Sequence, residues 1–175
     1  MSSRTARVLA VDDRRENLLA LTAILEGLPV EIVAVTSGED ALKRLLVEDY
    51  AVILLDAHMP GMDGFETAGH VKQRERTRHI PILFLTAVDY DPHLAFRGYQ
   101  AGAVDYITKP FDPWVLRSKV AVFVDLWTMH TQVLDQAEEC ARLRAGVDDA
   151  LRLLSAEPPA VQRARDRLTE LRDSS

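Results

Sequence analysis

Short runs of apolar residues alternate with segments of helical periodicity through the first two-thirds of the chain. The runs lie at 7–11, 31–35, 52–55, 82–85 and 104–107 and are nearly continuous in Val, Ile and Leu. Such runs are typical of strands that are covered on both faces. Their alternation with helices predicts an α/β fold with a parallel sheet and crossover helices. We assume the flavodoxin-like, doubly wound (βα)5 arrangement with strand order 2-1-3-4-5.

The segments between these runs carry the patterns of amphipathic helices. Apolar residues recur at helical spacing in the first two connections, at Leu18, Leu21 and Leu25 and at Ala41, Leu42, Leu45 and Leu46. Helix starts are predicted at the capping residues Ser37, Asp63, Asp91 and Asp112, the last two followed by proline. Gly27 is expected to end the first helix.

The last third of the chain predicts one long helix, because no proline follows Pro113 until Pro158. Alternate steps of four and three residues trace an apolar seam in which only Gln136 is polar: Val122, Leu126, Met129, Val133, Gln136, Cys140, Leu143, Val147, Ala150 and Leu154. This heptad pattern predicts a coiled-coil contact. A short terminal helix is expected at about 160–172, where Val161, Ala164, Leu168 and Leu171 recur.

We therefore expect a domain over 1–127 and a helical extension over 128–175, with the fifth helix continuing to about 155. Two partners for the seam remain open. It can pair with a second copy of the chain, or it can pack against the terminal helix of its own chain. The seam is longer than that short helix can cover, which favours a homodimer.

Composition excludes several classes of protein. The formal net charge of −6 argues against a nucleic-acid partner, which needs a basic surface. No apolar stretch is long enough for a membrane span or a signal peptide. The single cysteine, Cys140, excludes an internal disulfide and a thiolate metal cluster. We expect a cytoplasmic protein with no membrane partner.

Polar residues stand at or just beyond the carboxyl ends of the predicted strands. They are Asp12, Asp13, Asp56, Thr86 and Lys109. In the assumed strand order the first and third strands are neighbours, so the three aspartates converge where open α/β sheets bind ligands. Clustered carboxylates repel one another, and a small all-oxygen cluster suits Mg²⁺. With a lysine and a hydroxyl nearby, the set predicts phosphoryl transfer to a carboxylate.

Four segments together resemble the signatures of response-regulator receiver domains. They are Val-Asp-Asp at 11–13, Leu-Leu-Asp-Ala-His-Met-Pro-Gly-Met-Asp-Gly at 54–64, Leu-Thr-Ala at 85–87 and Asp-Tyr-Ile-Thr-Lys-Pro-Phe at 105–111. The resemblance spans roughly residues 7 to 127. It implies that Asp56 is the phosphoacceptor and that Asp13, Asp56 and the backbone carbonyl of His58 bind Mg²⁺, with Asp12 acting through water.

The resemblance also implies the residues that respond to phosphorylation. Lys109 would contact the phosphoryl group, and its bond to Pro110 would be cis. Thr86 and Tyr106 match the switch pair, on a face formed by the fourth helix, the fifth strand and the fifth helix.

The predicted function is a response regulator that takes a phosphoryl group from a sensor histidine kinase and switches a contact with a protein target or a fused output module. It would catalyse only its own phosphorylation and dephosphorylation. The alternatives are a receiver module of a longer signalling protein and a pseudo-receiver that is never phosphorylated. A haloacid-dehalogenase-like phosphatase is disfavoured because Arg14 stands where that family has a second aspartate. Asp13 has a further possible role as an N-cap of the first helix.

Overall fold

A parallel sheet forms the core of the first compact unit of the chain. The computed structural model describes residues 5–87, 105–155, 161, 163 and 166–170. Within these residues the strands are β1 (Ala6–Val11), β2 (Val30–Val35), β3 (Val52–Asp56), β4 (Ile82–Ala87) and β5 (Asp105–Lys109). They form a five-stranded sheet in the order β2-β1-β3-β4-β5, and every neighbouring pair is parallel. The predicted fold class and strand order are confirmed.

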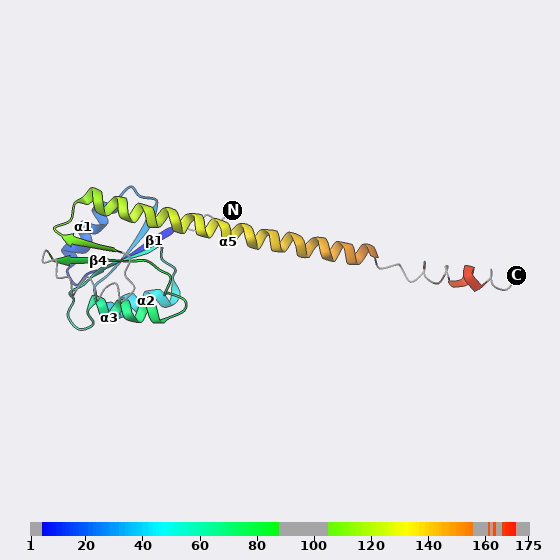
Figure 1. The fold of residues 1–175 in the computed structure, drawn as a ribbon, viewed down its shortest axis with the longest axis horizontal. Helices are drawn as coiled ribbons and strands as arrows, with labels where there is room; N and C mark the ends of the chain where they lie inside the picture. Colours follow the sequence, from blue (N-terminus) through cyan, green and yellow to red (C-terminus); the bar gives the residue numbers. More distant parts are fainter. Residues whose placement is uncertain (1–4, 88–104, 156–160, 162, 164–165, 171–175) are drawn as a thin grey trace. The chain divides into compact units, whose positions relative to one another are not determined.

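Helices cover both faces of this sheet (Figure 1). They are α1 (Arg15–Leu25), α2 (Gly38–Val47), α3 (Gly64–Gln73) and α5 (Pro113–Ser155). Helices α1 and α5 bury Leu21 and Leu116 in one apolar cluster, while α2 and α3 bury Leu45 and Val71 in a second. The predicted start at Asp91 lies outside the described residues.

Three of the predicted helix starts are present. The Ser37 hydroxyl accepts from the Asp40 amide at 3.2 Å, the Asp63 carboxylate from the Glu66 amide at 2.8 Å, and the Asp112 carboxylate from the Trp114 amide at 2.8 Å. Gly27 follows α1 with φ of 86°, a conformation that glycine adopts readily.

Two local expectations do not hold. The N-cap residue of α1 is Arg14, and its side chain makes no capping bond, so the alternative role of Asp13 as the cap is wrong. In α2, the predicted place of Leu46 on the apolar face is wrong, because its side chain is 54% exposed. Ala41 and Leu45 are buried and form the core contact of that helix.

The chain divides into two compact units, Met1–Thr131 and Gln132–Ser175, and α5 contributes to both. In the second unit every side chain that the structure describes is exposed. Residues 166–170 are helical, and most of the remainder of the expected terminal helix lies outside the described residues. The domain boundary expected after residue 127 stays a prediction. Among the described residues, no helix combines the length and hydropathy that a membrane span needs.

Helix α3 begins with its backbone packed tightly against the end of β3. The Gly64 amide donates to the Ala57 carbonyl at 3.1 Å, and a Cβ at Gly64 would overlap the carbonyl oxygen of Asp56. The overlapped atom belongs to the backbone, which cannot rotate aside as a flexible side chain does. A side chain at position 64 would therefore displace the strand end that carries Asp56.

We expect Gly64→Ala to lower the free energy of unfolding by about 2 kcal/mol, the usual cost of forcing extra atoms into a packed site. Gly69→Ala in the same helix is the matched control, because a Cβ there meets nothing within 4 Å. That variant should gain up to about 1 kcal/mol from helix propensity. Urea unfolding of both variants measures the difference, and equal stabilities would contradict the close packing at Gly64.

Candidate functional site

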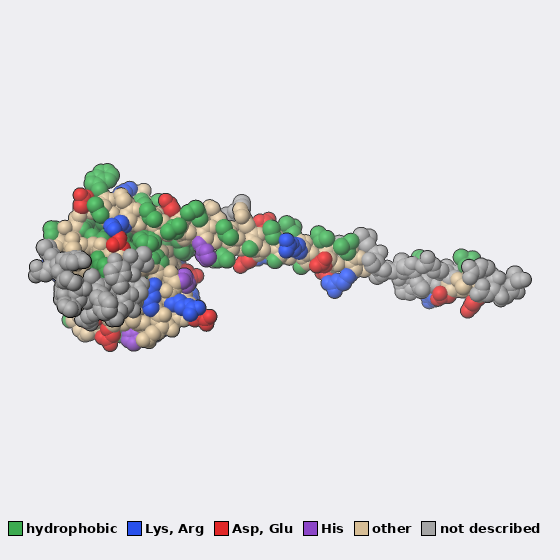
Figure 2. Space-filling model, in the orientation of Figure 1, with side chains coloured by type: hydrophobic (Ala, Val, Ile, Leu, Met, Phe, Trp, Pro, Cys, Tyr) green, Lys and Arg blue, Asp and Glu red, His purple; other side chains and the backbone are tan. Residues whose placement is uncertain are grey.

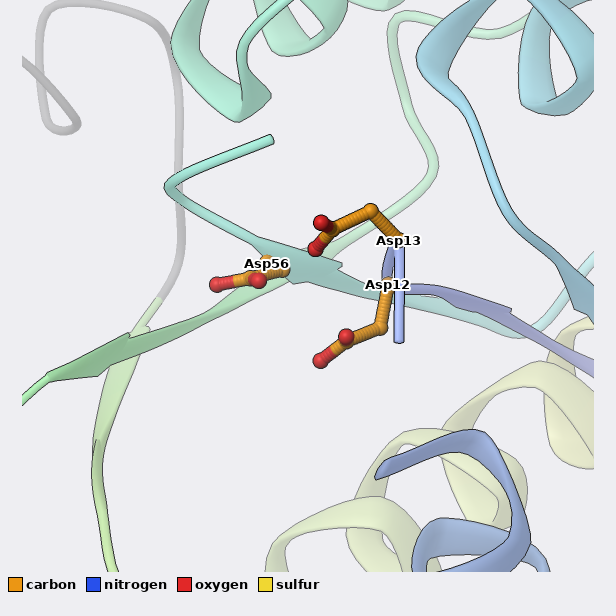
Figure 3. A group of neighbouring side chains, drawn as sticks. All are labelled: Asp12, Asp13 and Asp56. Atoms are coloured by element: carbon orange, nitrogen blue, oxygen red, sulfur yellow. The ribbon is translucent and has the colours of Figure 1, made fainter. Parts of the chain in front are cut away.

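Three carboxylates converge at the carboxyl edge of the sheet (Figure 3). Asp12 and Asp13 directly follow β1, and Asp56 is the last residue of β3. One oxygen from each of the three lies within 4.8 Å of the others. Because β1 pairs with β2 on one side and β3 on the other, this edge is the point where the strand order reverses. The structure thus brings the three aspartates together as the assumed strand order predicts.

Asp12 is completely buried, and the protein supplies all of its hydrogen bonds that the structure records. Its Oδ1 accepts from the Arg14 amide and from Asn17 Nδ2, both at 2.9 Å. Its Oδ2 accepts from Asn17 Nδ2 and from Lys109 Nζ, again at 2.9 Å. A carboxylate has about four acceptor positions, and these bonds use them. Asp12 therefore suits an indirect contact with a cation.

Asn17 is a positioning residue that the sequence analysis missed. It lies in the first turn of α1, half-buried, and its amide nitrogen bridges both carboxylate oxygens of Asp12. The sequence carried a weak signal for this role. Asparagine is a poor residue inside a helix, and its presence in the first turn after an acidic pair indicates a polar partner.

Lys109 supplies the positive charge of the site. It is the last residue of β5, and its Nζ lies 2.9 Å from Asp12 Oδ2 and 3.3 Å from Asp56 Oδ1. One ammonium group is thus shared between two carboxylates, while Asp13 is exposed beside them. The three carboxylates and this lysine together leave a net negative charge when all are ionised. The peptide bond between Lys109 and Pro110 is cis.

The environment of Asp56 disfavours its ionised form. Burial raises the pKa of the Asp56 carboxyl, the Lys109 ammonium lowers it, and the negative charge of Asp12 raises it again, with a net upward shift. The backbone amide of His58 also donates a hydrogen bond to Asp56 Oδ1, at 3.4 Å, and the His58 side chain is exposed. A cation beside Asp56 would favour its ionised form.

The remaining predicted residues lie on β4 and β5. Thr86 is half-buried and pairs in register with Thr108. Tyr106 stacks on Phe84 with ring centroids 5.6 Å apart and packs against the apolar cluster of α2 and α3. The fourth helix of the expected switching face lies outside the described residues, so that face stays a prediction.

The family model described as the response regulator receiver domain matches residues 8–121. The chain belongs to this family. It is 33% identical to the sensor histidine kinase GacS of Pseudomonas protegens, over 94% of this chain and 21% of that protein. It is 38% identical to the response regulator PleD of Caulobacter vibrioides, over 66% of this chain and 25% of that protein. The chain therefore spans about a quarter or less of the length of these two relatives.

Solved structures agree with this assignment. A crystal structure of a putative response regulator from Chloroflexus aurantiacus superimposes with a TM-score of 0.65 at 33% identity, covering 70% of this chain and 99% of the other. The similarity of fold and the similarity of sequence thus cover the same receiver domain. The acidic cluster occupies its carboxyl edge and has a donor set that can bind a metal ion.

The raised pKa of Asp56 gives a test of the site by stability. A carboxyl whose pKa is higher in the folded state stabilises the protein when protonated, and that stability is lost as the pH rises through the folded-state pKa. Asp56→Asn is neutral at every pH, and Lys109 keeps Asp12 as a partner. We therefore expect this variant to melt about 3 °C higher than the parent at pH 7 without Mg²⁺, with a smaller difference in acid.

Added Mg²⁺ should raise the melting temperature of the parent and have little effect on Asp56→Asn, because a ligand stabilises the state that binds it. Asp49→Asn removes one surface charge that is paired with Arg76, and serves as the control. Equal responses of the parent and Asp56→Asn to Mg²⁺ would show that Asp56 is not part of a cation site.

Proposed function

We propose that this chain is a response regulator in which Asp56 accepts a phosphoryl group from a sensor histidine kinase, with Mg²⁺ bound beside it. The observation that carries the proposal is the close approach of the three aspartates, with Lys109 Nζ between Asp12 and Asp56. Receiver domains accept phosphoryl groups from sensor histidine kinases, and the family match covers these residues. The kinase, the downstream target and the cytoplasmic location are part of the proposal.

The acidic cluster suits Mg²⁺ because all of its donors are oxygens and few of them come from the protein. We assign direct contacts to Asp13, Asp56 and the His58 carbonyl, and an indirect one to Asp12, whose oxygens are already hydrogen bonded. When bound, the ion neutralises carboxylates and phosphoryl oxygens. Exposure of Asp13 leaves room for water and phosphate oxygens to complete the coordination.

The chain's own residues then perform the transfer. An Asp56 oxygen forms a bond to phosphorus as the bond from phosphorus to the donor nitrogen breaks, and the electron pair remains on the donor histidine. Lys109 offsets the charge on the phosphoryl oxygens, and the Thr86 hydroxyl donates a hydrogen bond to one of them. Thr86 and Tyr106 would pass the change to a protein contact.

Two alternatives remain, and one of them has an observation in its favour. Alignment of 94% of this chain within one-fifth of GacS favours a receiver module of a longer signalling protein. A pseudo-receiver needs no phosphoryl chemistry, but the complete acidic set and Lys109 argue against it. Autocatalytic phosphorylation and dephosphorylation is the only catalysis that we propose.

Acetyl phosphate with Mg²⁺ should add one phosphoryl group to the parent protein, as measured by intact mass. Asp56→Asn should remain unmodified because it lacks the nucleophilic oxygen, and Asp49→Asn should react like the parent. Chelation of Mg²⁺ should prevent the reaction. Modification that persists in Asp56→Asn would move the acceptor elsewhere, and an unmodified parent would support the pseudo-receiver.

We also propose that the chain forms a homodimer through α5, because the apolar seam residues Val122, Leu126, Val133, Leu143 and Val147 are solvent-exposed in the single chain. Sedimentation of the whole chain should give a dimer mass, and a chain that ends near Trp127 should give a monomer mass. A monomeric whole chain would remove the dimer and favour packing within one chain.

A further inference from the structure

Helix α5 has two apolar faces in the first unit. Leu116, Val120 and Val124 are buried against the core, at spacings of four residues. Val122 and Leu126 are 55% and 53% exposed. Residues two apart on a helix lie about 200° apart around its axis, so the second face points away from the core. It has no partner among the described residues of the chain.

The exposed apolar positions continue in the second unit at the same spacing. Val133, Leu143 and Val147 are 62%, 64% and 58% exposed. Hydrophobic side chains are visible on the surface along α5 (Figure 2). A surface of this length with heptad spacing fits another helix of the same kind.

The heptad steps assign each seam residue to a core position. Leu126, Val133, Cys140 and Val147 are at a, and Val122, Met129, Gln136 and Leu143 are at d. Valine occupies two of these four a positions and Leu143 one of the d positions, and in parallel coiled coils valine at a with leucine at d favours two strands. In a parallel pair without stagger, each a residue packs beside its own equivalent, so Cys140 would lie beside Cys140 of the second copy.

Charges beside the seam point to the same orientation. The charged residues at g are acidic, Asp125 and Glu139, and the charged residue at e is the basic Arg144. In parallel coiled coils g faces the following e of the other helix, whereas in antiparallel ones g faces g and e faces e. Only the parallel pair therefore sets Glu139 against Arg144.

We infer that two copies of the chain pair through α5 as a parallel, in-register coiled coil, in which Glu139 of each chain faces Arg144 of the second copy. This inference rests on the proposed homodimer and adds its orientation and register. In such a dimer the α5 helices of the two copies run side by side in the same direction. The second copy is the occupant because its seam matches in length, spacing and flanking charge.

Charge reversal tests the pairing at low ionic strength, where exposed ion pairs are least screened. Glu139→Arg and Arg144→Glu should each raise the dimer dissociation constant about tenfold, because both symmetric pairs become repulsive. An equimolar mixture of the two variants should dimerise as tightly as the parent, because both pairs are attractive again. Glu138→Arg and Arg142→Glu, which lie at the outward f and c positions, are the matched controls and should leave the constant unchanged.

Thiol crosslinking tests the register. A short bismaleimide should join two copies through Cys140 in the full chain. It should also join two copies of the variant Val133→Cys/Cys140→Ser, whose thiol lies one heptad earlier, because equivalent a residues of an in-register pair lie side by side along the whole coiled coil. Ala145→Cys/Cys140→Ser carries its thiol at an outward f position and should not be joined.

The results of these experiments distinguish the parallel register from the homodimer and from the phosphorylation of Asp56. A monomer in sedimentation overturns both the dimer and its orientation. A dimer that links at only one of the two heights, or a variant mixture that does not recover, overturns the parallel register and leaves the dimer intact. Phosphorylation of Asp56 is measured separately by mass and is unaffected by either result.

Discussion

Electrostatic repulsion among three carboxylates is the constraint on which the site depends. Two unit charges about 4.8 Å apart repel by about 3 kcal/mol at an effective dielectric constant near 20. Lys109 offsets part of this repulsion at Asp12 and Asp56. Burial nevertheless raises the pKa of Asp56, and the negative charge of Asp12 adds to that rise. The three carboxylates and one lysine carry a net negative charge when all are ionised, and the proposed binding of a cation and a phosphoryl group at this edge of the sheet rests on that charge.

The fold holds the members of this cluster to different degrees. Asp12 is buried and bonded by Asn17, Lys109 and the start of α1, and Asp56 is fixed by the strand pairing of β3 and by the packing of Gly64. Asp13 is exposed. Two carboxylates are thus preorganised by the core, while the third is open to solvent and can adjust to what binds. Rigid anchoring with one accessible carboxylate is consistent with the proposed reversible binding of a cation and a phosphoryl group.

Sequence reasoning succeeded where the determinants are local or topological. Ser37, Asp63 and Asp112 cap helices through neighbours two or three residues away. The convergence of Asp12 with Asp56 follows from the strand order, which was assumed and which the structure confirms. Sequence reasoning failed where the contacts depend on the geometry of individual side chains. Three features depend on side-chain rotamers, which no sequence pattern encodes. They are the hydrogen bonds from Asn17 to Asp12, the absence of a cap at Asp13 and the sharing of Lys109 between two carboxylates. Leu46 repeats at helical spacing, yet it is exposed, because it lies about 140° around the helix axis from the buried Ala41, whereas Leu45 lies about 40° from it.

Helix α5 starts at Pro113, so only Pro110, Phe111 and Asp112 separate it from Lys109. A regular helix has no slack, and each residue added or removed turns everything beyond it by about 100°. Within the first unit, the directions in which Val122 and Leu126 project from α5 therefore depend on the number of residues that precede them in the helix. An insertion or deletion within this helix therefore keeps the heptad pattern in phase only when it adds or removes whole heptads.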